Sequence, residues 1–349
     1  MIARRWLGAA LGVVLAAFMV TAAPSGPFVL TARVETTPVE SRGDAADDSA
    51  IWFNRASPGE SRVLATDKLR GLEVYDLHGR NVQSLPLGRL NNVDLRQDVP
   101  MRGGYMDLAV ATHRDELGLA VFEIQDSGQV RFLGLARTGL EEIYGVCLYR
   151  YGEQLHVFSN GKDGRYMQHR LAVSDSGPEV TLLREFRLDS QPEGCVVDDP
   201  SGRLFMGEES VGVWVMAASP DAALDRDLVI RAEAPLAADI EGLALHGSEF
   251  LLVSSQGNHR FAVLEAAPPY RLRGIFRIDH DPVAGIGHVR DTDGVAVSAH
   301  DFGPGFRQGL VVVQDGDNAP RNQNFKYLAW AQIAEVLGLD DAIGQARRR

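Results

Sequence analysis

The 349-residue sequence contains only two cysteines, and its cysteines and histidines form no cluster with the spacing of a transition-metal site. Cys147 and Cys195 each lie inside an apolar, strand-like run, so a disulfide and two buried thiols are equally compatible with their positions. His113, His169 and His259 follow no ligand pattern, and we expect them at the molecular surface. A zinc centre or a redox metal is therefore not indicated.

The sequence also lacks the signatures of protein nucleophiles. It has no Gly-x-Ser-x-Gly, no Arg-His-Gly-x-Arg, no Cys-x5-Arg loop, no P-loop and no His-Glu-x-x-His. If the protein is an enzyme, we expect that its chemistry does not depend on a serine, cysteine or histidine nucleophile.

Long apolar runs are confined to the N-terminus. Residues 1–23 carry Arg4 and Arg5, then an apolar run from Trp6 to Val20, then small residues, which is the layout of a secretory signal peptide. The run is short for a membrane-spanning helix, and no cysteine follows it as in a lipoprotein. We expect a secreted or periplasmic protein that is not embedded in a membrane.

Basic side chains are scarce, with 35 Lys and Arg against 47 Asp and Glu. Removal of residues 1–23 leaves 33 basic side chains and a net charge of about −14. Such a charge argues against binding to nucleic acid or to anionic membranes. The acidic surplus could serve solubility alone or collect cations. Nothing in the sequence demands a partner protein, and we expect a monomer.

Helical periodicity is almost absent before "YLAWAQIAEVLG", and short apolar runs broken by Gly, Asp, Asn and Pro predict an all-β protein. Similar strand starts recur as "ADDSAIWF", "LNNVDLR", "EIYGVCLY", "QPEGCVVDD", "DIEGLAL" and "DTDGVAV". The residues at these starts are Asp48, Asn92, Tyr144, Glu193, Glu241 and Asp293, at intervals of 44, 52, 49, 48 and 52 residues. Six such units predict a single-domain, six-bladed β-propeller.

A second series of strands ends in polar clusters: "RVLATDKLRG", "MDLAVATHRDE", "LHVFSNGKDG", "RLFMGEES", "FLLVSSQGN" and "GLVVVQDGD". Since the start of one strand and the end of the next share an edge in an antiparallel meander, both series should meet around one end of the axis. The basic members of this ring are Lys68, Arg114 and Lys162. Its opposite, acidic sector contains Asp47, Asp48, Glu193, Glu209, Asp239, Glu241, Gln256 and Asp293.

Crowded carboxylates repel one another unless a cation neutralises them. Hard oxygen ligands without a matching His or Cys set favour Ca²⁺ or Mg²⁺. A cation site beside a Lys/Arg sector suits a polyphosphorylated small molecule, whose phosphates each carry about −1.5 to −2 charges. The metal could also activate a bound water as the nucleophile.

With these motifs the chain resembles the β-propeller phytases, which are also called alkaline phytases. The matching stretches are "DAADDSAIWF", "GLEVYDLHG", "LNNVDLR", "IYGVCLY", "QPEGCVVDD", "GEES", "DIEGLAL", "SSQGN", "DTDGVAV" and "NQNFKYLAW". They occur in family order, which implies a propeller domain at about residues 35–335, with residues 336–349 as a C-terminal tail. The resemblance implies calcium-dependent hydrolysis of inositol hexakisphosphate (phytate), bound as its calcium complex, to lower inositol phosphates and phosphate.

The resemblance also implies roles for individual residues. The calcium ligands would be Asp47, Glu193, Glu209, Asp239, Glu241, Gln256 and Asp293. The phosphate-binding, catalytic groups would be Lys68, Arg114, Tyr144 and Lys162. Asp48 and the backbone carbonyl of Val93 would hold a structural calcium. Leu69 stands where family members often carry a second lysine, with Arg70 next to it.

Two other functions use the same fold. A calcium-dependent lactonase or esterase would also need axial carboxylates, but it has no use for three cations in the opposite sector. A propeller that only binds a partner would not require both charge series, although propellers host many unrelated functions.

Overall fold

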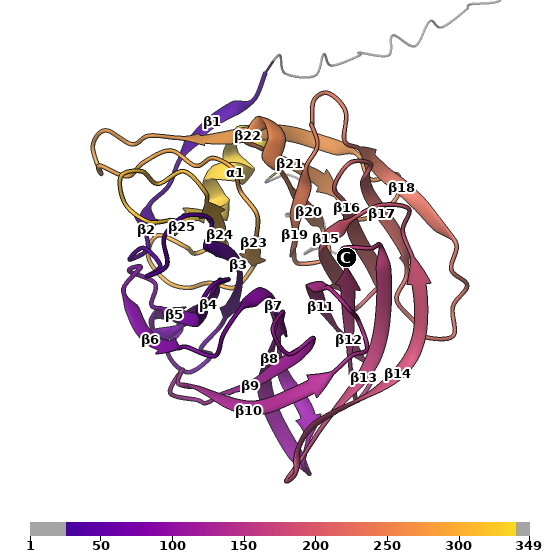
Figure 1. Ribbon diagram of the computed structural model, residues 1–349. Coiled ribbons are helices and arrows are strands. Elements are labelled where there is room, and N and C mark those ends of the chain that lie inside the picture. Colours follow the sequence, from indigo (N-terminus) through magenta and orange to yellow (C-terminus); the bar gives the residue numbers. More distant parts are fainter. Residues whose placement is uncertain (1–25, 340–349) are drawn as a thin grey trace, which may run out of the picture.

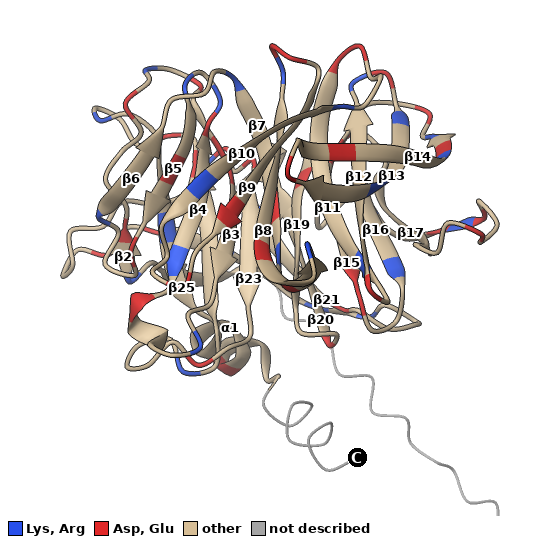
Figure 2. Cartoon of the chain, turned by 90° about the horizontal axis from the view of Figure 1, so that it is seen from below, with Lys and Arg blue, Asp and Glu red and all other residues tan. Residues whose placement is uncertain are grey.

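The computed structural model describes residues 26–339, so the expected signal peptide, residues 1–23, lies outside the described residues. Six sheets stand around a central axis like the blades of a propeller (Figure 1), and each sheet contains four or five strands. This arrangement confirms the predicted single-domain, all-β, six-bladed fold. Basic and acidic residues both occur in the loops and along the strands (Figure 2).

The strands occupy equivalent positions in successive blades. The innermost strands are β3 (Ala46–Trp52), β7 (Leu90–Met101), β11 (Ile143–Tyr151), β15 (Pro192–Asp198), β19 (Ile240–His246) and β23 (Val295–Ser298). The second strands are β4 (Arg62–Asp67), β8 (Gly104–His113), β12 (Gln154–Gly161), β16 (Arg203–Glu208), β20 (Phe250–Ser255) and β24 (Leu310–Asp315). The third strands are β5 (Gly71–Tyr75), β9 (Gly118–Ile124), β13 (Arg165–Ser174), β17 (Gly212–Ala217), β21 (Arg260–Glu265) and β25 (Asn324–Ala329). The outer strands are β6 (Asn81–Leu85), β10 (Val130–Arg137), β14 (Gly177–Arg187), β18 (Arg226–Arg231), β22 (Leu272–Asp279) and β2 (Val34–Glu35).

The N-terminal segment closes the ring. Strand β2 pairs antiparallel with β25 and completes the last blade, while β1 (Phe28–Thr31) adds a parallel strand to the outer edge of β22. Helix α1 (Trp330–Leu337) follows β25 and confirms the helical stretch predicted near the end of the chain. Two short 3₁₀ helices, Pro58–Glu60 and Gln256–Asn258, lie in loops. Among the described residues, no helix has the length and hydropathy to cross a bilayer.

The inner strands are largely buried because each blade packs on both of its faces. Strand β3, for example, is buried along its whole length although it contains Asp47 and Asp48. Cys147 in β11 and Cys195 in β15 form a disulfide between neighbouring blades, with their Cα atoms 5.7 Å apart. The structure therefore decides between the two alternatives that the sequence left open.

A β-bulge recurs where the inner strands begin. In β19, for example, the pairing with β20 shifts between Ile240 and Leu243, so that one extra residue is present on the inner strand. The same shift occurs in β3, β7, β11 and β15. The residue pairs inside the bulges are Asp47–Asp48, Asn91–Asn92, Tyr144–Gly145, Glu193–Gly194 and Glu241–Gly242, and Asp293–Gly294 precedes β23 at the matching place.

These registers correct the sequence comparison by one residue in the first two blades. The residues equivalent to Tyr144 are Asp47 and Asn91, whereas Asp48 and Asn92 occupy the second bulge position. The error arose because two consecutive acids, and then two consecutive asparagines, offered no means of choosing between neighbours in the sequence.

Glycine occupies the second bulge position in the other four blades because the backbone of the next blade lies against it. A Cβ atom on Gly194 would lie 2.2 Å from the carbonyl oxygen of Glu241, and one on Gly242 would lie 2.5 Å from the backbone nitrogen of Val295. The series ends at Gly294, where a Cβ atom would lie 2.3 Å from Oδ1 of Asp48. The inner strands thus pack backbone against backbone around the axis.

This packing predicts the effect of adding one methyl group. Gly194→Ala should lower the free energy of unfolding by about 3 kcal/mol, because the contacting atoms belong to backbone that cannot move aside without distorting the bulge. Gly104→Ala is the matched control, since nothing lies within 4 Å of its Cβ position, and its effect should stay within about 0.5 kcal/mol. Urea unfolding at constant calcium concentration measures both. Equal stabilities of the two variants would contradict the close packing.

Candidate active site

The first bulge residues form a ring around one end of the axis, which we call the axial ring. Its members are Asp47, Asn91, Tyr144, Glu193, Glu241 and Asp293. A bulge bends the strand and re-aims its side chains, which here brings them toward the axis. Asp47, Glu193 and Glu241 are only 1–5 % exposed, so three carboxylates are buried next to one another.

Asn91 is a member of this ring that the sequence reasoning missed. Its amide nitrogen lies 3.2 Å from Oε1 of Glu193 and 3.5 Å from Oδ1 of Asp47. Its amide oxygen accepts a hydrogen bond of 3.3 Å from Arg114. The fully buried Asn91 therefore connects the carboxylates with one of the cationic side chains. The repeated bulge register would have identified it, but that register is visible only in the structure.

Burial dominates the electrostatics of the carboxylates. It raises the pKa of Glu193 to about 7, with the charge of Asp47 adding to the effect. Burial followed by the charge of Glu193 raises the pKa of Glu241, and burial followed by the charge of Asp47 raises the pKa of Asp293. Each group is thus held in surroundings that disfavour its negative charge.

The same carboxylates have the geometry of a cation site. Oxygen atoms of Glu193, Glu209 and Glu241 lie within 4.8 Å of one another. Oε2 of Glu241 is buried and accepts no hydrogen bond within the described part of the chain, and the buried Oδ2 of Asp47 has only the ion-pair contact with Lys68 at 3.2 Å. Unpaired buried oxygens are costly unless a positive charge balances them. The residues present therefore fit a divalent cation with oxygen ligands.

The remaining expected ligands lie next to this cluster. The side-chain amide of Gln256 donates a hydrogen bond to Asp293, and its backbone nitrogen donates to the carbonyl of Asp239 at 2.9 Å. Asp239 precedes β19 and is exposed. Its charge, after burial, contributes to the raised pKa of Glu209. Asp239, Glu209 and Gln256 thus extend the acidic cluster toward solvent.

The three cations differ in their surroundings. Nζ of Lys162 lies 4.2 Å from the ring centroid of Tyr144, and Cζ of Arg114 lies 5.8 Å from the same centroid. Lys68 instead contacts carboxylates, including Asp44, which the sequence reasoning did not select. The prediction of a basic sector opposite the acidic sector is therefore wrong for Lys68, which lies inside the acidic cluster.

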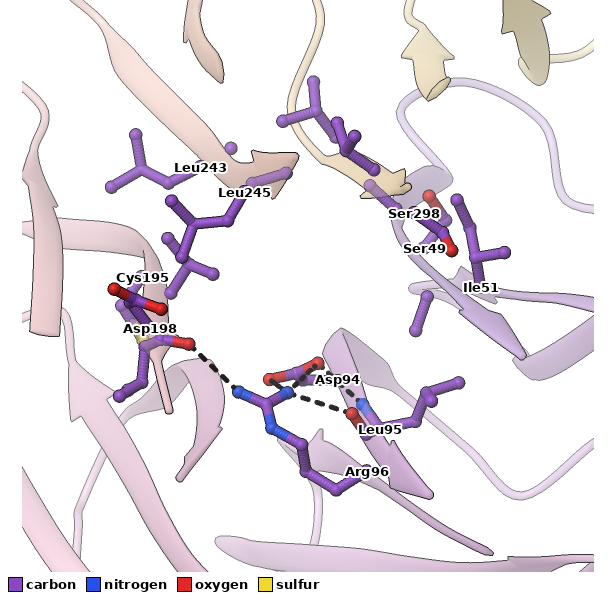
Figure 3. A pocket seen from close by; sticks show the side chains of 18 of the residues that line it. Ser49, Ile51, Asp94, Leu95, Arg96, Cys195, Asp198, Leu243, Leu245 and Ser298 are labelled. Carbon is purple, nitrogen blue, oxygen red and sulfur yellow. Dashed lines mark hydrogen bonds and ion pairs between the residues drawn. The ribbon is translucent and has the colours of Figure 1, made fainter. Parts of the chain in front are cut away.

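Asp48 and Val93 face the other way, into a channel along the axis. The channel has a volume of about 460 Å³ and is lined by apolar side chains such as Leu95, Leu243 and Leu245 (Figure 3). Oδ2 of Asp48 accepts hydrogen bonds from Asn92 Nδ2 at 3.2 Å and from the Val93 backbone nitrogen at 3.1 Å. The two expected ligands of the structural calcium thus lie together, on the channel side of the axial ring.

The far part of the channel holds an ion-pair cluster. Arg96 forms ion pairs with Asp94 at 3.0 Å and with Asp199 at 2.8 Å. Figure 3 shows the contact between Arg96 and Asp94. A smaller pocket of about 300 Å³ lies beside the axial ring and includes Arg89, Arg114 and Lys162.

Two further expectations require correction. His113 and His169 are buried, at 4 % and 3 % exposure, so they are not surface residues. A ring nitrogen of His113 hydrogen-bonds the carbonyl of Leu87 at 2.8 Å, a packing role that its sequence position did not reveal. His259 is partly exposed and pairs with Asp291. Arg70, the neighbour of Leu69, is paired with Glu40.

Comparison with known proteins adds an independent line of evidence. The family described as Phytase matches residues 7–346. The chain is also 38 % identical, over 333 residues, to a 3-phytase of Bacillus subtilis (strain 168), and the match covers 89 % of this chain and 86 % of that protein. The six-bladed fold, the axial ring and these matches lead to one conclusion: the chain belongs to the phytase family.

Proposed function

We propose that this phytase hydrolyses phytate in a calcium-dependent reaction at the axial ring, releasing phosphate and lower inositol phosphates. The observation that carries the proposal is the meeting of buried carboxylates and cationic side chains at one end of the axis. Phytate presents several adjacent phosphates, so different phosphates can contact cations of both kinds at the same time. We further propose that the protein acts as a monomer.

The metal site would be formed by Asp47, Glu193, Glu209, Asp239, Glu241, Gln256 and Asp293. Calcium is favoured over zinc because every donor is a hard oxygen. A cation held by these residues would neutralise their negative charge and would supply the Lewis acidity that activates a water molecule as the nucleophile. Asp48 and the carbonyl of Val93 would hold a second ion of structural importance on the channel side.

The side chains of the protein bind and orient the phosphate. Arg114 and Lys162 lie around Tyr144 and contact no carboxylate among the described residues, so their charges are available to a phosphoryl group. Charge-assisted hydrogen bonds from these cations stabilise negative charge that is redistributed in the transition state. Tyr144 holds both cations in place, and Asn91 fixes Arg114 relative to the carboxylates. A neutral lactone would gain nothing from this cationic sector, which favours phosphate as the substrate group.

We also propose that the protein is secreted or periplasmic. The signal-peptide pattern at residues 1–23 supports this location. The disulfide between Cys147 and Cys195 supports it as well, because structural disulfides persist in oxidising compartments.

Removal of calcium provides the first test. Exhaustive chelation and dialysis should abolish phosphate release from phytate, and added calcium should restore it, because an unneutralised acidic cluster repels an anionic substrate. A colorimetric assay of phosphate measures both states. Magnesium at equal concentration is the control for a general charge effect. Full activity in the chelated protein would exclude the proposed reaction.

Substitutions of the cationic residues and of the carboxylates should have different kinetic effects. Arg114→Ala or Lys162→Ala should lower kcat/KM for phytate by the equivalent of about 2–4 kcal/mol, because each removes a cationic donor to phosphate. Glu241→Gln should instead raise the calcium concentration needed for half-maximal activity. Arg137→Ala is the control for loss of one positive charge, because Arg137 lies outside the axial ring and its side chain is 75 % exposed. If Arg114→Ala, Lys162→Ala and Glu241→Gln all matched the wild type, the axial ring could not be the active site.

The raised carboxyl pKa values predict an unusual pH dependence of stability in the chelated protein. At Glu193 the folded state binds more protons than the unfolded state between about pH 4.5 and pH 7, because these are the pKa values of the unfolded and folded states, and the excess disappears as the pH rises through 7. The melting temperature should therefore fall as the pH rises through this window, and Glu193→Gln should flatten the slope. Buried histidines, such as His156 with a pKa near 4, act in the opposite direction between about pH 4 and pH 6.5, so the fall should be clearest near pH 7. Differential scanning calorimetry with and without calcium checks the prediction, and a melting temperature that rose with pH in chelator would contradict it.

A further inference from the structure

Lys68 occupies a position that a metal ion would also favour. Its Nζ lies 2.8 Å from Asp44 Oδ1, 3.1 Å from Asp293 Oδ2 and 3.2 Å from Asp47 Oδ2. The three carboxylates come from different segments, namely the loop before β3, the bulge of β3 and the residue pair before β23. The Lys68 side chain is only 12 % exposed, so its charge is held among these oxygens rather than in water.

The contacts of Lys68 are ion pairs, because its ammonium nitrogen lies within 3.2 Å of three carboxylate oxygens. The side chains of Asp47 and Asp293 are only 1 % and 13 % exposed, so the ammonium group offsets part of the cost of burying their charges. Lys68 therefore serves as a counter-ion for two of the carboxylates that are proposed to bind calcium.

Among the three cationic side chains of the site, only Lys68 forms ion pairs with carboxylates of the described residues. Lys162 lies over the ring of Tyr144, and Arg114 donates to the amide of Asn91. Neither lies within ion-pair distance of a carboxylate in the part of the chain that the structure describes. A phosphate can thus contact Lys162 and Arg114 directly, whereas Lys68 must first leave Asp47 and Asp293.

We propose that Lys68 and a divalent cation exchange places at Asp47 and Asp293. An ammonium group and a dication repel each other, so they compete for the same carboxylate oxygens. Binding of the dication displaces Lys68, and the released ammonium group is then free to bind a substrate phosphate. Lys68 thereby makes its own phosphate contact depend on prior cation binding. This inference rests on the proposed function, because it assumes that the carboxylates bind the metal and the cations bind phosphate.

Calcium titration of metal-free protein, without phosphate, tests the exchange. Lys68→Met keeps the apolar stem and removes the competing charge, so isothermal titration calorimetry should show calcium binding on the order of tenfold tighter than in the wild type. Lys162→Met is the matched control, because it removes one charge from the same site without vacating a carboxylate. Its affinity should remain within about threefold of the wild type. Lys68→Arg retains the charge and should bind calcium about as the wild type does.

The possible outcomes are distinct. An affinity of Lys68→Met for calcium that is clearly higher than that of Lys162→Met supports the exchange, provided that both variants melt cooperatively. Equal affinities of the two variants, or weaker binding by Lys68→Met, would overturn it and assign Lys68 to holding the carboxylates in place. If Lys68→Met fails to fold, Lys68→Arg decides the question, because loss of calcium binding in that variant would also contradict a purely competitive role. A wild-type protein that bound no calcium would refute the proposed function itself, whereas a calcium-dependent wild-type phytase with unchanged Lys68→Met binding would refute the exchange alone.

Discussion

The close approach of neighbouring inner strands is the constraint on which the site depends. Each bulge places one side chain toward the axis and presents the following residue to the next blade, where only a glycine fits in four of the six positions. Because the backbones touch, side chains from six separate sequence segments meet within a few ångströms. The functional groups are therefore positioned by the packing of blades, and the loops contribute mainly at the rim.

This placement has an electrostatic cost that shapes the chemistry. Asp47, Glu193 and Glu241 are buried where water cannot stabilise their charges. The protein offsets part of the cost internally, through Lys68 and the amide of Asn91. The unpaired Oε2 atom of Glu241 shows that the offset is incomplete. A fold that keeps unbalanced carboxylates in its interior is well prepared to bind a strongly charged ion.

The sequence predicted the architecture well because repetition is visible in one dimension. Six similar strand starts and six polar strand ends were sufficient to predict six blades and to bring Glu193, Glu241 and Asp293 to one face. Features that depend on register or on contacts across the axis were not accessible. Asn91 was overlooked because Asn92 stood beside it, and Lys68 was assigned to a separate sector because sequence order carries no information about distance across a ring. The burial of His113 depends likewise on the neighbouring chain, in this case the carbonyl of Leu87.

The closure of the last blade has a consequence for the order in which the protein can mature. Strand β2, near the start of the described chain, pairs with β25, near its end, as in the contact of Glu35 with Lys326. A ribosome releases the N-terminal strand long before its partner exists, so the ring stays open until synthesis is almost finished. Asp293 belongs to the blade that this pairing completes and Asp47 belongs to the next blade, so they cannot meet before the ring closes. Assembly of the complete cation site is therefore a late event, and a partly made chain has no complete active site.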